Sequence, residues 1–586
     1  MTRARLAVAV LLCGVGLIGP QARARALDAA QPLGDPVLEP PTLHCLGAYW
    51  IIRGDDDEDA TVRVTYRPAG TDEWRIGPAL FRVEKGAHKP GDRESMLDVP
   101  DDAWLFAGSV LVLRPDTQYE TRLSLVDPDG GSTERVLTGH TIAEPTEPAD
   151  APGYHVIPGG GGGAGTEADP YRGLEAAQSH ARPGDVFLLH AGVYAGTFTA
   201  RVSGEPGRPI IWRGAGDGEA VIDGQGQAAE RPGRGVSASG IHDVWFEGLT
   251  IRNADYALVG HDSARLVIRR CHMHDVEFGI TFTRNDNDAT QGFFISDNVI
   301  EGPSTWPRTR GIEDARGIQA TGAGHVICYN RIRGFADAID TFPSARCVAI
   351  DFHNNEISEM TDDGVEMDYS ERNTRCFLNR LTNVFQGISV QPVYGGPVYI
   401  VRNAMYNVCV EPFKMHNGPS GALMIHNTCV KRGVPLVLWT SEPVHNCVYR
   451  NNLFVGTSGN YAYETTAPMV HCDFDYDGFG GGPWDQFLKW NDTRYRTIED
   501  VRANASVYRH VVDVGRASVF ASGVEPPADE TKQFDVALND LRLKAGCSAI
   551  DAGEAVPGFD QGAVGAGPDL GAYELGSEMP HYGPRR

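Results

Sequence analysis

The fold is decided between residues 298 and 454, where an asparagine followed two positions later by an apolar residue recurs. The repeats are Asn298-Val299-Ile300, Asn330-Arg331-Ile332, Asn355-Glu356-Ile357, Asn379-Arg380-Leu381, Asn403-Ala404-Met405, Asn427-Thr428-Cys429 and Asn452-Leu453-Phe454. From Asn330 onward they are spaced by 25, 24, 24, 24 and 25 residues. A period of that length, rich in short strands, fits one coil of a parallel β-helix in which equivalent asparagines stack and ladder their amides.

The two ends of the repeat region support this interpretation. Residues 170–177 predict a short helix, and residues 182–194 lead from a turn into a strand. This passage resembles the opening of pectin-lyase-like β-helix domains, in which a helix caps the first coil and covers its core and strand edges. Residues 541–553 and 568–574 resemble the closing segment of secreted bacterial β-helix proteins. We therefore assign residues 154–577 to a right-handed parallel β-helix that carries the catalytic site, and the resemblance implies a polysaccharide-active protein.

A second, smaller domain is expected over residues 38–146. Runs such as Thr61–Tyr66 and Thr121–Val126 alternate apolar and polar residues, and turn clusters such as residues 127–131 separate them. This pattern is typical of an antiparallel β-sandwich. The stretch Leu113–Tyr119 resembles the strand entry and tyrosine corner of fibronectin type III-like domains. The whole chain is thus predicted to be all-β, with a small sandwich before the β-helix.

The N-terminus and the overall charge limit where the protein acts. Residues 1–26 combine a basic start, a short apolar run and a small-residue end, which predicts a secretory signal and a secreted or periplasmic protein. No other stretch approaches the length of a membrane span. The net charge of −25 argues against nucleic acid as a partner. We expect a monomer whose partner is an extracellular polysaccharide. Export permits disulfides among the cysteines after Cys13, but their pairing cannot be read from the sequence.

A further strand in each coil can be aligned by its own pattern. The aligned segments are Arg316–Thr321, Asp337–Phe342, Asp363–Asp368, Gln386–Gln391, Glu411–His416 and Val434–Trp439. Their third and fifth positions are mostly apolar and are expected to face the core. Alternation then places the fourth and sixth positions on the outer face.

The outward positions gather acids, bases and aromatic rings on one face. The fourth positions are Gln319, Asp340, Glu366, Ser389, Lys414 and Val437, and the sixth are Thr321, Phe342, Asp368, Gln391, His416 and Trp439. Stacked strands lie about 4.8 Å apart, so Asp340, Glu366 and Asp368 should form a carboxylate cluster with Lys414 and His416 nearby. Carboxylates that close must share a proton or bind a cation. We expect these five residues to be catalytic, and the three acids to hold Ca²⁺ through oxygen ligands.

Other residues are candidates for contacting the sugar chain. Trp439 and Phe342 offer flat rings that match the apolar face of a pyranose. Tyr369 and Arg372 lie just beyond a strand and could line the rim, where Arg372 could grip a substrate carboxylate. The remaining candidates for substrate binding are Gln391, Gln319 and Arg316.

Two reactions fit this face, and a third possibility is binding without catalysis. In a uronic-acid lyase, a cation neutralises the substrate carboxylate and a base such as Lys414, His416 or Tyr369 removes the C5 proton. In a glycoside hydrolase, two carboxylates act as acid and base. The pair Asp362-Asp363 resembles the paired aspartates of polygalacturonase-like hydrolases, but their other motifs are not found at matching positions, and Asp363 is expected to shape a turn. We favour the lyase because Lys414 and His416 share the face with the acids. An adhesive β-helix is the non-enzyme alternative.

Overall fold

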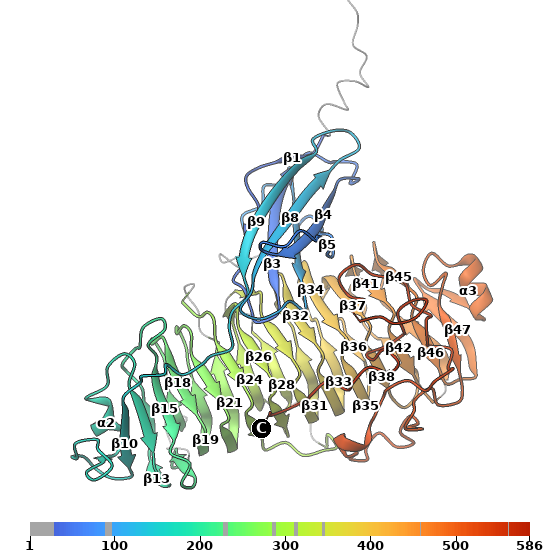
Figure 1. Cartoon of the computed structure of the whole chain (residues 1–586). Helices are drawn as coiled ribbons and strands as arrows, with labels where there is room; N and C mark the ends of the chain where they lie inside the picture. The colour runs from blue at the N-terminus through green and yellow to red at the C-terminus, as the bar shows by residue number, and fades with distance from the viewer. Residues whose placement is uncertain are drawn as a thin grey trace, which may run out of the picture.

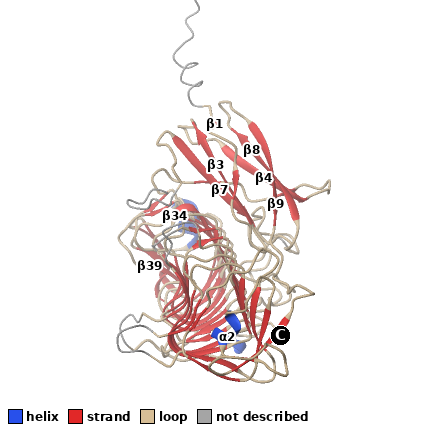
Figure 2. Cartoon of the chain, turned by 90° about the vertical axis from the view of Figure 1, so that its left-hand side faces the viewer, coloured by secondary structure: helices blue, strands red, loops and turns tan. Residues whose placement is uncertain are grey.

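The computed structural model describes residues 29–585 apart from 88–96, 227–232, 284–288, 310–313, 343–345, 458 and 561. A small antiparallel sandwich stands on one side of a long parallel β-helix (Figures 1 and 2). The predicted fold class is therefore confirmed. Within the described ranges, no helix has the length and apolarity that a membrane crossing needs. The predicted signal at residues 1–26 lies outside the described residues.

The sandwich consists of two antiparallel sheets. One sheet contains β1 (Gln31–Pro32), β2 (Val37–Leu38), β3 (Leu46–Arg53), β6 (Phe81–Arg82) and β7 (Ala103–Val110), and the other β4 (Thr61–Pro68), β5 (Arg75–Ile76), β8 (Gln118–Val126) and β9 (Thr133–His140). Alternate residues of β4 and β8 are buried in a core that includes Trp50 and Leu123. The Tyr119 hydroxyl accepts a hydrogen bond from the backbone N–H of Arg114 at 3.0 Å, which is the contact that a tyrosine corner makes. The resemblance to fibronectin type III-like domains stays a prediction.

The β-helix is built from two large parallel sheets. The first sheet contains β10 (Gly153–Ile157), β11 (Tyr171–Arg172), β12 (Val186–Leu189), β15 (Ile210–Gly214), β18 (Val244–Glu247), β20 (Val267–Arg269), β22 (Phe294–Ser296), β26 (Val326–Cys328), β30 (Asp351–His353), β32 (Thr374–Phe377), β34 (Tyr394–Val401), β37 (Ser420–Ile425), β40 (Val444–His445), β41 (Val448–Arg450), β44 (Met469–Val470) and β45 (Asp473–Asp475).

The second sheet carries the face with the predicted site. It contains β13 (Gly192–Ala195), β14 (Phe198–Thr199), β16 (Ala220–Asp223), β17 (Arg234–Ser237), β19 (Thr250–Val259), β21 (His272–Phe282), β23 (Val299–Glu301), β24 (Arg316–Ala320), β27 (Arg331–Arg333), β28 (Asp337–Thr341), β31 (Glu356–Glu366), β33 (Arg380–Ser389), β35 (Ala404–Val408), β36 (Phe413–Lys414), β38 (Thr428–Val430), β42 (Leu453–Val455), β46 (Gly478–Gly480) and β49 (Val512–Gly515). Two smaller groups complete the β-helix, β25 (Gly322–Ala323) with β29 (Cys347–Val348), and β39 (Leu436–Leu438) with β43 (Gly459–Thr465), β47 (Trp484–Trp490) and β48 (Thr493–Tyr495).

The asparagine ladder predicted from the repeat is present and buried. The Oδ1 atom of Asn379 accepts hydrogen bonds from the backbone N–H and the Nδ2 of Asn355 at 3.0 and 2.9 Å. The Nδ2 of Asn379 also donates to the carbonyl of Phe352 at 2.9 Å. The same pattern runs from Asn298 to Asn452, where the ladder ends on the carboxylate of Asp477. Each coil is therefore held in register with the next by side chains as well as by strand pairing.

Short helices and the C-terminal segment complete the β-helix. Helix α2 (Leu174–Gln178) buries Leu174 and Ala177 against the first coils, as the predicted cap should. Helix α3 (Ile498–Asn504) and the 3₁₀ helix η1 (Val536–Leu538) lie in the C-terminal part. Beyond β49 the chain returns along the outside of the coils, where the carbonyls of Glu525 and Phe534 accept side-chain hydrogen bonds from Tyr406 and Asn383.

Removing one rung of the ladder tests how much it stabilises the fold. Asn379→Ala leaves two donors of Asn355 without an acceptor and the Phe352 carbonyl without its donor. Because each unsatisfied buried group costs about 1–3 kcal/mol, we expect unfolding to become easier by about 3 kcal/mol or more in urea denaturation. The exposed Asn460→Ala is the control, with an expected change within about 0.5 kcal/mol. Equal losses in the two variants would contradict the role given to the ladder.

Candidate functional site

The aligned column of polar residues is in the register that the sequence predicts. Gln319 of β24 pairs with Asp340 of β28, and Asp340 pairs with Glu366 of β31. The column continues through Ser389 of β33 to Lys414 of β36. Five consecutive coils thus bring a lysine and two carboxylic acids into one row.

The burial of this row differs from the expectation of an open outer face. Asp340 is 2 % exposed and Gln319 is 9 % exposed. Only Glu366 and Lys414 of the row's charged residues are partly accessible, with 12 % of the Lys414 side chain exposed. The sequence predicts correctly which positions face the core and which face outward, but the outward side chains cover one another. The row is therefore a largely buried charged cluster that reaches solvent at Glu366 and Lys414.

A second row of charged residues, which the sequence interpretation missed, lies beside the first. It consists of the first positions of the same segments, where Arg316 pairs with Asp337 and Asp363 pairs with Gln386. The backbone N–H of Asp363 donates to Asp337 Oδ1 at 2.7 Å. The expectation that Asp363 only shapes a turn is wrong, because its side chain is buried and lies in the cluster. A register shift in β31 between Met360 and Asp363 places this acid there.

Ion pairs connect the two rows. The Lys414 Nζ lies 2.6 Å from Asp363 Oδ2, and the Arg316 Nε lies 2.8 Å from Asp337 Oδ2 and 3.6 Å from Asp340 Oδ2. Arg316 is therefore held inside the cluster by two aspartates. The Arg316 side chain remains 15 % exposed, and its contact with a substrate stays a prediction.

Several carboxylate oxygens of the cluster are positioned as a cation site would require. Oxygens of Asp337, Asp362 and Asp363 lie within 4.8 Å of one another. Among the described residues, Asp340 Oδ1 and Asp363 Oδ1 are buried without a hydrogen-bond partner. Hard oxygen ligands of this kind suit Ca²⁺. The group that converges is not the expected set of Asp340, Glu366 and Asp368, because Asp368 uses its Oδ1 to accept hydrogen bonds from Ser389 Oγ and the Gln391 N–H.

The cluster holds more negative than positive charge. Its acids are Asp337, Asp340, Asp362, Asp363, Glu366 and Asp368, and its cations are Arg308, Arg316 and Lys414. Burial raises the pKa of Asp340 and of Asp368 to about 7, and burial together with Asp337 raises the pKa of Glu366 well above its usual value. Despite burial, Asp363 and the neighbouring acids raise the pKa of Lys414. Without a bound cation, the acids must therefore hold protons at neutral pH.

His416 and Trp439 form a separate group at the next coils. The His416 Nε2 lies 3.1 Å from Glu411 Oε2, and the backbone N–H of Trp439 donates to Glu411 Oε1 at 2.8 Å. The Trp439 side chain is 53 % exposed and lines a cleft of about 450 Å³. Phe342 is also exposed, at 40 %. Trp439 therefore presents a solvent-accessible ring on the outer face, as the sequence predicts.

One of the two expected rim residues, Arg372, lies elsewhere. Arg372 is buried where the sandwich meets the β-helix, and it pairs with Glu39 and Glu371. It also lies over the ring of Tyr49. The expected grip of Arg372 on a substrate carboxylate is therefore wrong, because its charge is neutralised at a domain contact. Tyr369 is half-buried, and its ring lies 6.5 Å from the ring of Tyr394.

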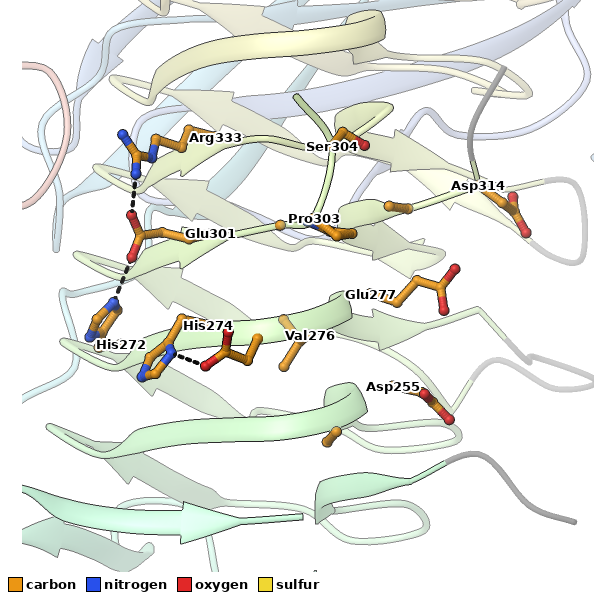
Figure 3. Close-up of a pocket in the computed structure, with 14 residues that line it drawn as sticks. Asp255, His272, His274, Val276, Glu277, Glu301, Pro303, Ser304, Asp314 and Arg333 are labelled. Atoms are coloured by element: carbon orange, nitrogen blue, oxygen red, sulfur yellow. Dashed lines mark hydrogen bonds and ion pairs between the residues drawn. The ribbon is translucent and has the colours of Figure 1, made fainter. Parts of the chain in front are cut away.

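A groove of about 940 Å³ lies next to the cluster and was not predicted. One side carries His272 and Arg333, which both contact Glu301, at 2.9 and 3.1 Å (Figure 3). Asp314 and Glu277 lie on the other side of the groove in this view. Asp314 connects the groove to the cluster, since its Oδ1 lies 3.6 Å from Arg316. Glu301 and Arg333 are strand partners, each three residues after a ladder asparagine, so the repeat carries this part of the groove, whereas Asp314 lies in a loop outside the repeat.

Comparisons with known proteins give structural neighbours only. No family model matches the chain, and no curated protein matches it. A crystal structure of pectate lyase Pel9A matches with a TM-score of 0.43 and 18 % identity over 72 % of this chain and 96 % of that one. The complex of XylC with xylose matches with a TM-score of 0.44 and 13 % identity over 57 % and 85 % of the two chains. The alginate lyase from Paenibacillus sp. str. FPU-7 matches with a TM-score of 0.30 and 17 % identity over 51 % and 95 %. At these values the comparisons assign neither a family nor a reaction.

The raised pKa of Asp340 predicts how stability depends on pH. Its pKa is about 7 when folded and near 3.8 when unfolded, so the folded state binds the proton more tightly and stability is lost as pH rises from about 4 to 7. Asp340→Asn stays neutral and keeps an acceptor for Gln319. In the presence of a chelator we expect it to stabilise the protein by about 2–4 kcal/mol at pH 8 and to have no effect at pH 4. The exposed Asp485→Asn is the control, and an effect of Asp340→Asn that does not vary with pH would contradict this account.

Proposed function

We propose that this chain is a secreted or periplasmic polysaccharide lyase that cleaves a uronic-acid-containing polymer by β-elimination. The observation that carries the proposal is the position of Lys414. Its amine is partly accessible to solvent and is held 2.6 Å from Asp363, at the edge of a buried carboxylate cluster. A base beside a site that can hold a cation is the pair that β-elimination at a uronate needs.

Lys414 is the proposed base that removes the C5 proton of the uronate. Asp363 orients the amine, and Asp363 with the neighbouring acids raises the pKa of Lys414. A base must be neutral to accept a proton, so the proposed role requires a cation on these acids, which would neutralise their charge and lower the pKa of the amine again. His416, held by Glu411, is the neighbouring group proposed to exchange a proton with the sugar oxygen. Tyr369 is the remaining candidate base.

The acid cluster fits a bound Ca²⁺. Asp337, Asp362 and Asp363 would hold it, since their oxygens converge and Asp363 Oδ1 has no hydrogen-bond partner among the described residues. Asp340 and Glu366 flank this group in the aligned row. When bound, Ca²⁺ would neutralise the acids and the substrate carboxylate, which acidifies the C5 proton. It would also relieve the repulsion between a polyanion and a protein with a net charge of −25.

The sugar chain is proposed to pass over the accessible edge of the cluster. The groove that ends at Asp314 lies on one side, and the exposed ring of Trp439 lies toward the opposite end of the coils. A flat indole ring can stack on a pyranose, and the half-buried Gln391 can hydrogen-bond sugar hydroxyls. We do not include Gln319 among the proposed sugar contacts, because it is buried and donates a hydrogen bond to Asp340.

Hydrolysis is the second candidate, and Glu366 is the observation that favours it. This acid is partly accessible and has a strongly raised pKa. A carboxylic acid that stays protonated near neutral pH can serve as a general acid. Asp340 lies on the adjacent coil, about 4.8 Å away along the β-helix, which is close to the separation of about 5–5.5 Å in retaining hydrolases.

Substitution of Lys414 tests the proposed reaction. We expect Lys414→Ala to lower kcat by about 10²- to 10⁴-fold because the base is lost. The assay incubates the full chain with pectic, alginate and glycosaminoglycan polymers, as well as neutral glucans, and follows the ultraviolet absorbance of unsaturated uronate products. Lys544→Ala, at an exposed site, is the control with unchanged activity. New reducing ends without that absorbance would indicate hydrolysis instead of β-elimination. Polysaccharide binding without either signal would indicate a non-catalytic protein.

Calcium binding tests the corrected ligand set. We expect Ca²⁺ to raise the Tm of the chelator-treated protein, because an ion that binds only the folded state stabilises it. Asp362→Asn should raise the calcium concentration needed for half of this increase in Tm by at least about tenfold, since a charged ligand is lost. Asp368→Asn is the matched control, because Asp368 is engaged by Ser389 and Gln391 instead. An unchanged Tm on adding Ca²⁺ to the native chain would exclude the site.

A further inference from the structure

Cys447 and Cys472 occupy matching positions in two consecutive coils. Val448 of β41 pairs with Asp473 of β45, so the residue before each of them is a cysteine in the same place. Two residues before the cysteines, His445 of β40 pairs with Val470 of β44. The backbone N–H of Asp473 also donates to the Cys447 carbonyl at 2.9 Å. The two cysteines are therefore stacked one coil apart.

The two thiols are in contact. A side-chain hydrogen bond links them. The Cys447 sulfur also lies 3.2 Å from the His445 carbonyl oxygen, and the Cys472 sulfur lies 3.5 Å from the carbonyl oxygens of Val444 and Val470. Stacked residues of a parallel sheet lie about 4.8 Å apart, which falls inside the Cα–Cα range of about 4.4–6.8 Å that disulfides adopt. The backbone would not have to move far for a bond to form between them.

We propose that Cys447 and Cys472 form a disulfide bond that links two consecutive coils of the β-helix. The proposal rests on strand register and thiol contact, and it is independent of the reaction that the protein catalyses. It gives one specific pairing among the ten described cysteines, none of which forms a disulfide in this structure.

The oxidation proceeds by thiol–disulfide exchange with a disulfide oxidant, such as an export-compartment oxidoreductase or glutathione disulfide. Cys472 is half-buried and Cys447 is fully buried, so Cys472 is the thiol that an oxidant can reach. Its thiolate attacks the oxidant, forms a mixed disulfide and expels one thiolate. Cys447 then attacks the Cys472 sulfur and expels the second thiolate. The two protons from the cysteines go to the two leaving thiolates, and the oxidant is reduced to two thiols.

The bond would reinforce a place where two coils are paired by very short strands. β40 and β44 have 2 residues each, and β41 and β45 have 3 each. The turns at this place also contact the sandwich, since His445 Nδ1 lies 3.1 Å from Glu84 Oε1 and Asn446 Nδ2 donates to the Arg82 carbonyl at 2.9 Å. A covalent link between these coils would hold the docking surface for the sandwich in place.

Peptide mapping of the full chain tests the pairing. The protein is equilibrated with glutathione disulfide, alkylated with iodoacetamide in denaturant and digested with trypsin. We expect residues 433–450 and 451–489 to appear as one linked species that separates on reduction. We also expect the oxidised protein to unfold several degrees above the reduced one, because the crosslink restricts the unfolded chain.

Three variants make the result specific. Cys447→Ser and Cys472→Ser should each abolish the linked species and the dependence of Tm on reductant. Cys409→Ser is the matched control, since this half-buried thiol contacts the Glu530 carbonyl and should leave both readouts unchanged. Full alkylation of Cys447 and Cys472 after treatment with glutathione disulfide, or a linkage of either cysteine to a different one, would overturn the proposal. Because the mapping does not depend on catalysis, its failure leaves the lyase proposal untouched.

Discussion

The stacking of one coil on the next, fixed by the asparagine ladder, is the constraint on which the rest of the structure depends. Each ladder asparagine accepts two hydrogen bonds from the coil before it and donates to a buried carbonyl. A slip of one residue would leave these groups unpaired in the core and would turn every side chain to the opposite face. Columns of side chains therefore keep their alignment over many coils, and a functional site can be assembled from residues far apart in sequence.

That alignment has a cost where the column is charged. The acids around Asp337 and Asp363 are buried, and Arg316 and Lys414 neutralise only part of their charge. A core built for stability alone would place apolar residues there, because burying ions costs more than their attraction returns unless each is well paired. Among the described residues, Asp340 Oδ1 and Asp363 Oδ1 are buried without a hydrogen-bond partner, and the cation that we propose there would satisfy oxygens of this kind.

The sandwich is packed firmly against the coils that carry the site. Ser109 accepts a hydrogen bond from Arg375 and donates one to Asn373, while Glu39 pairs with Arg372. On the β-helix side these contacts are made by Arg372, Asn373 and Arg375, at or just before β32, only a few residues after the acids Asp363 to Asp368. The N-terminal domain therefore braces the same coils whose register builds the cluster, and it removes Arg372 from the set of residues that can meet a substrate.

The sequence by itself determined the β-helix, the sandwich and the row from Gln319 to Lys414, because a repeat of constant length carries strand register with it. It also singled out Lys414 and Trp439. Only the tertiary structure decided how deeply the acids are buried, that Asp337 and Asp363 join them, and that Arg372 belongs to a domain contact. These features depend on a local shift in β31 and on a partner domain far away in the chain, and neither leaves a periodic signal in the sequence.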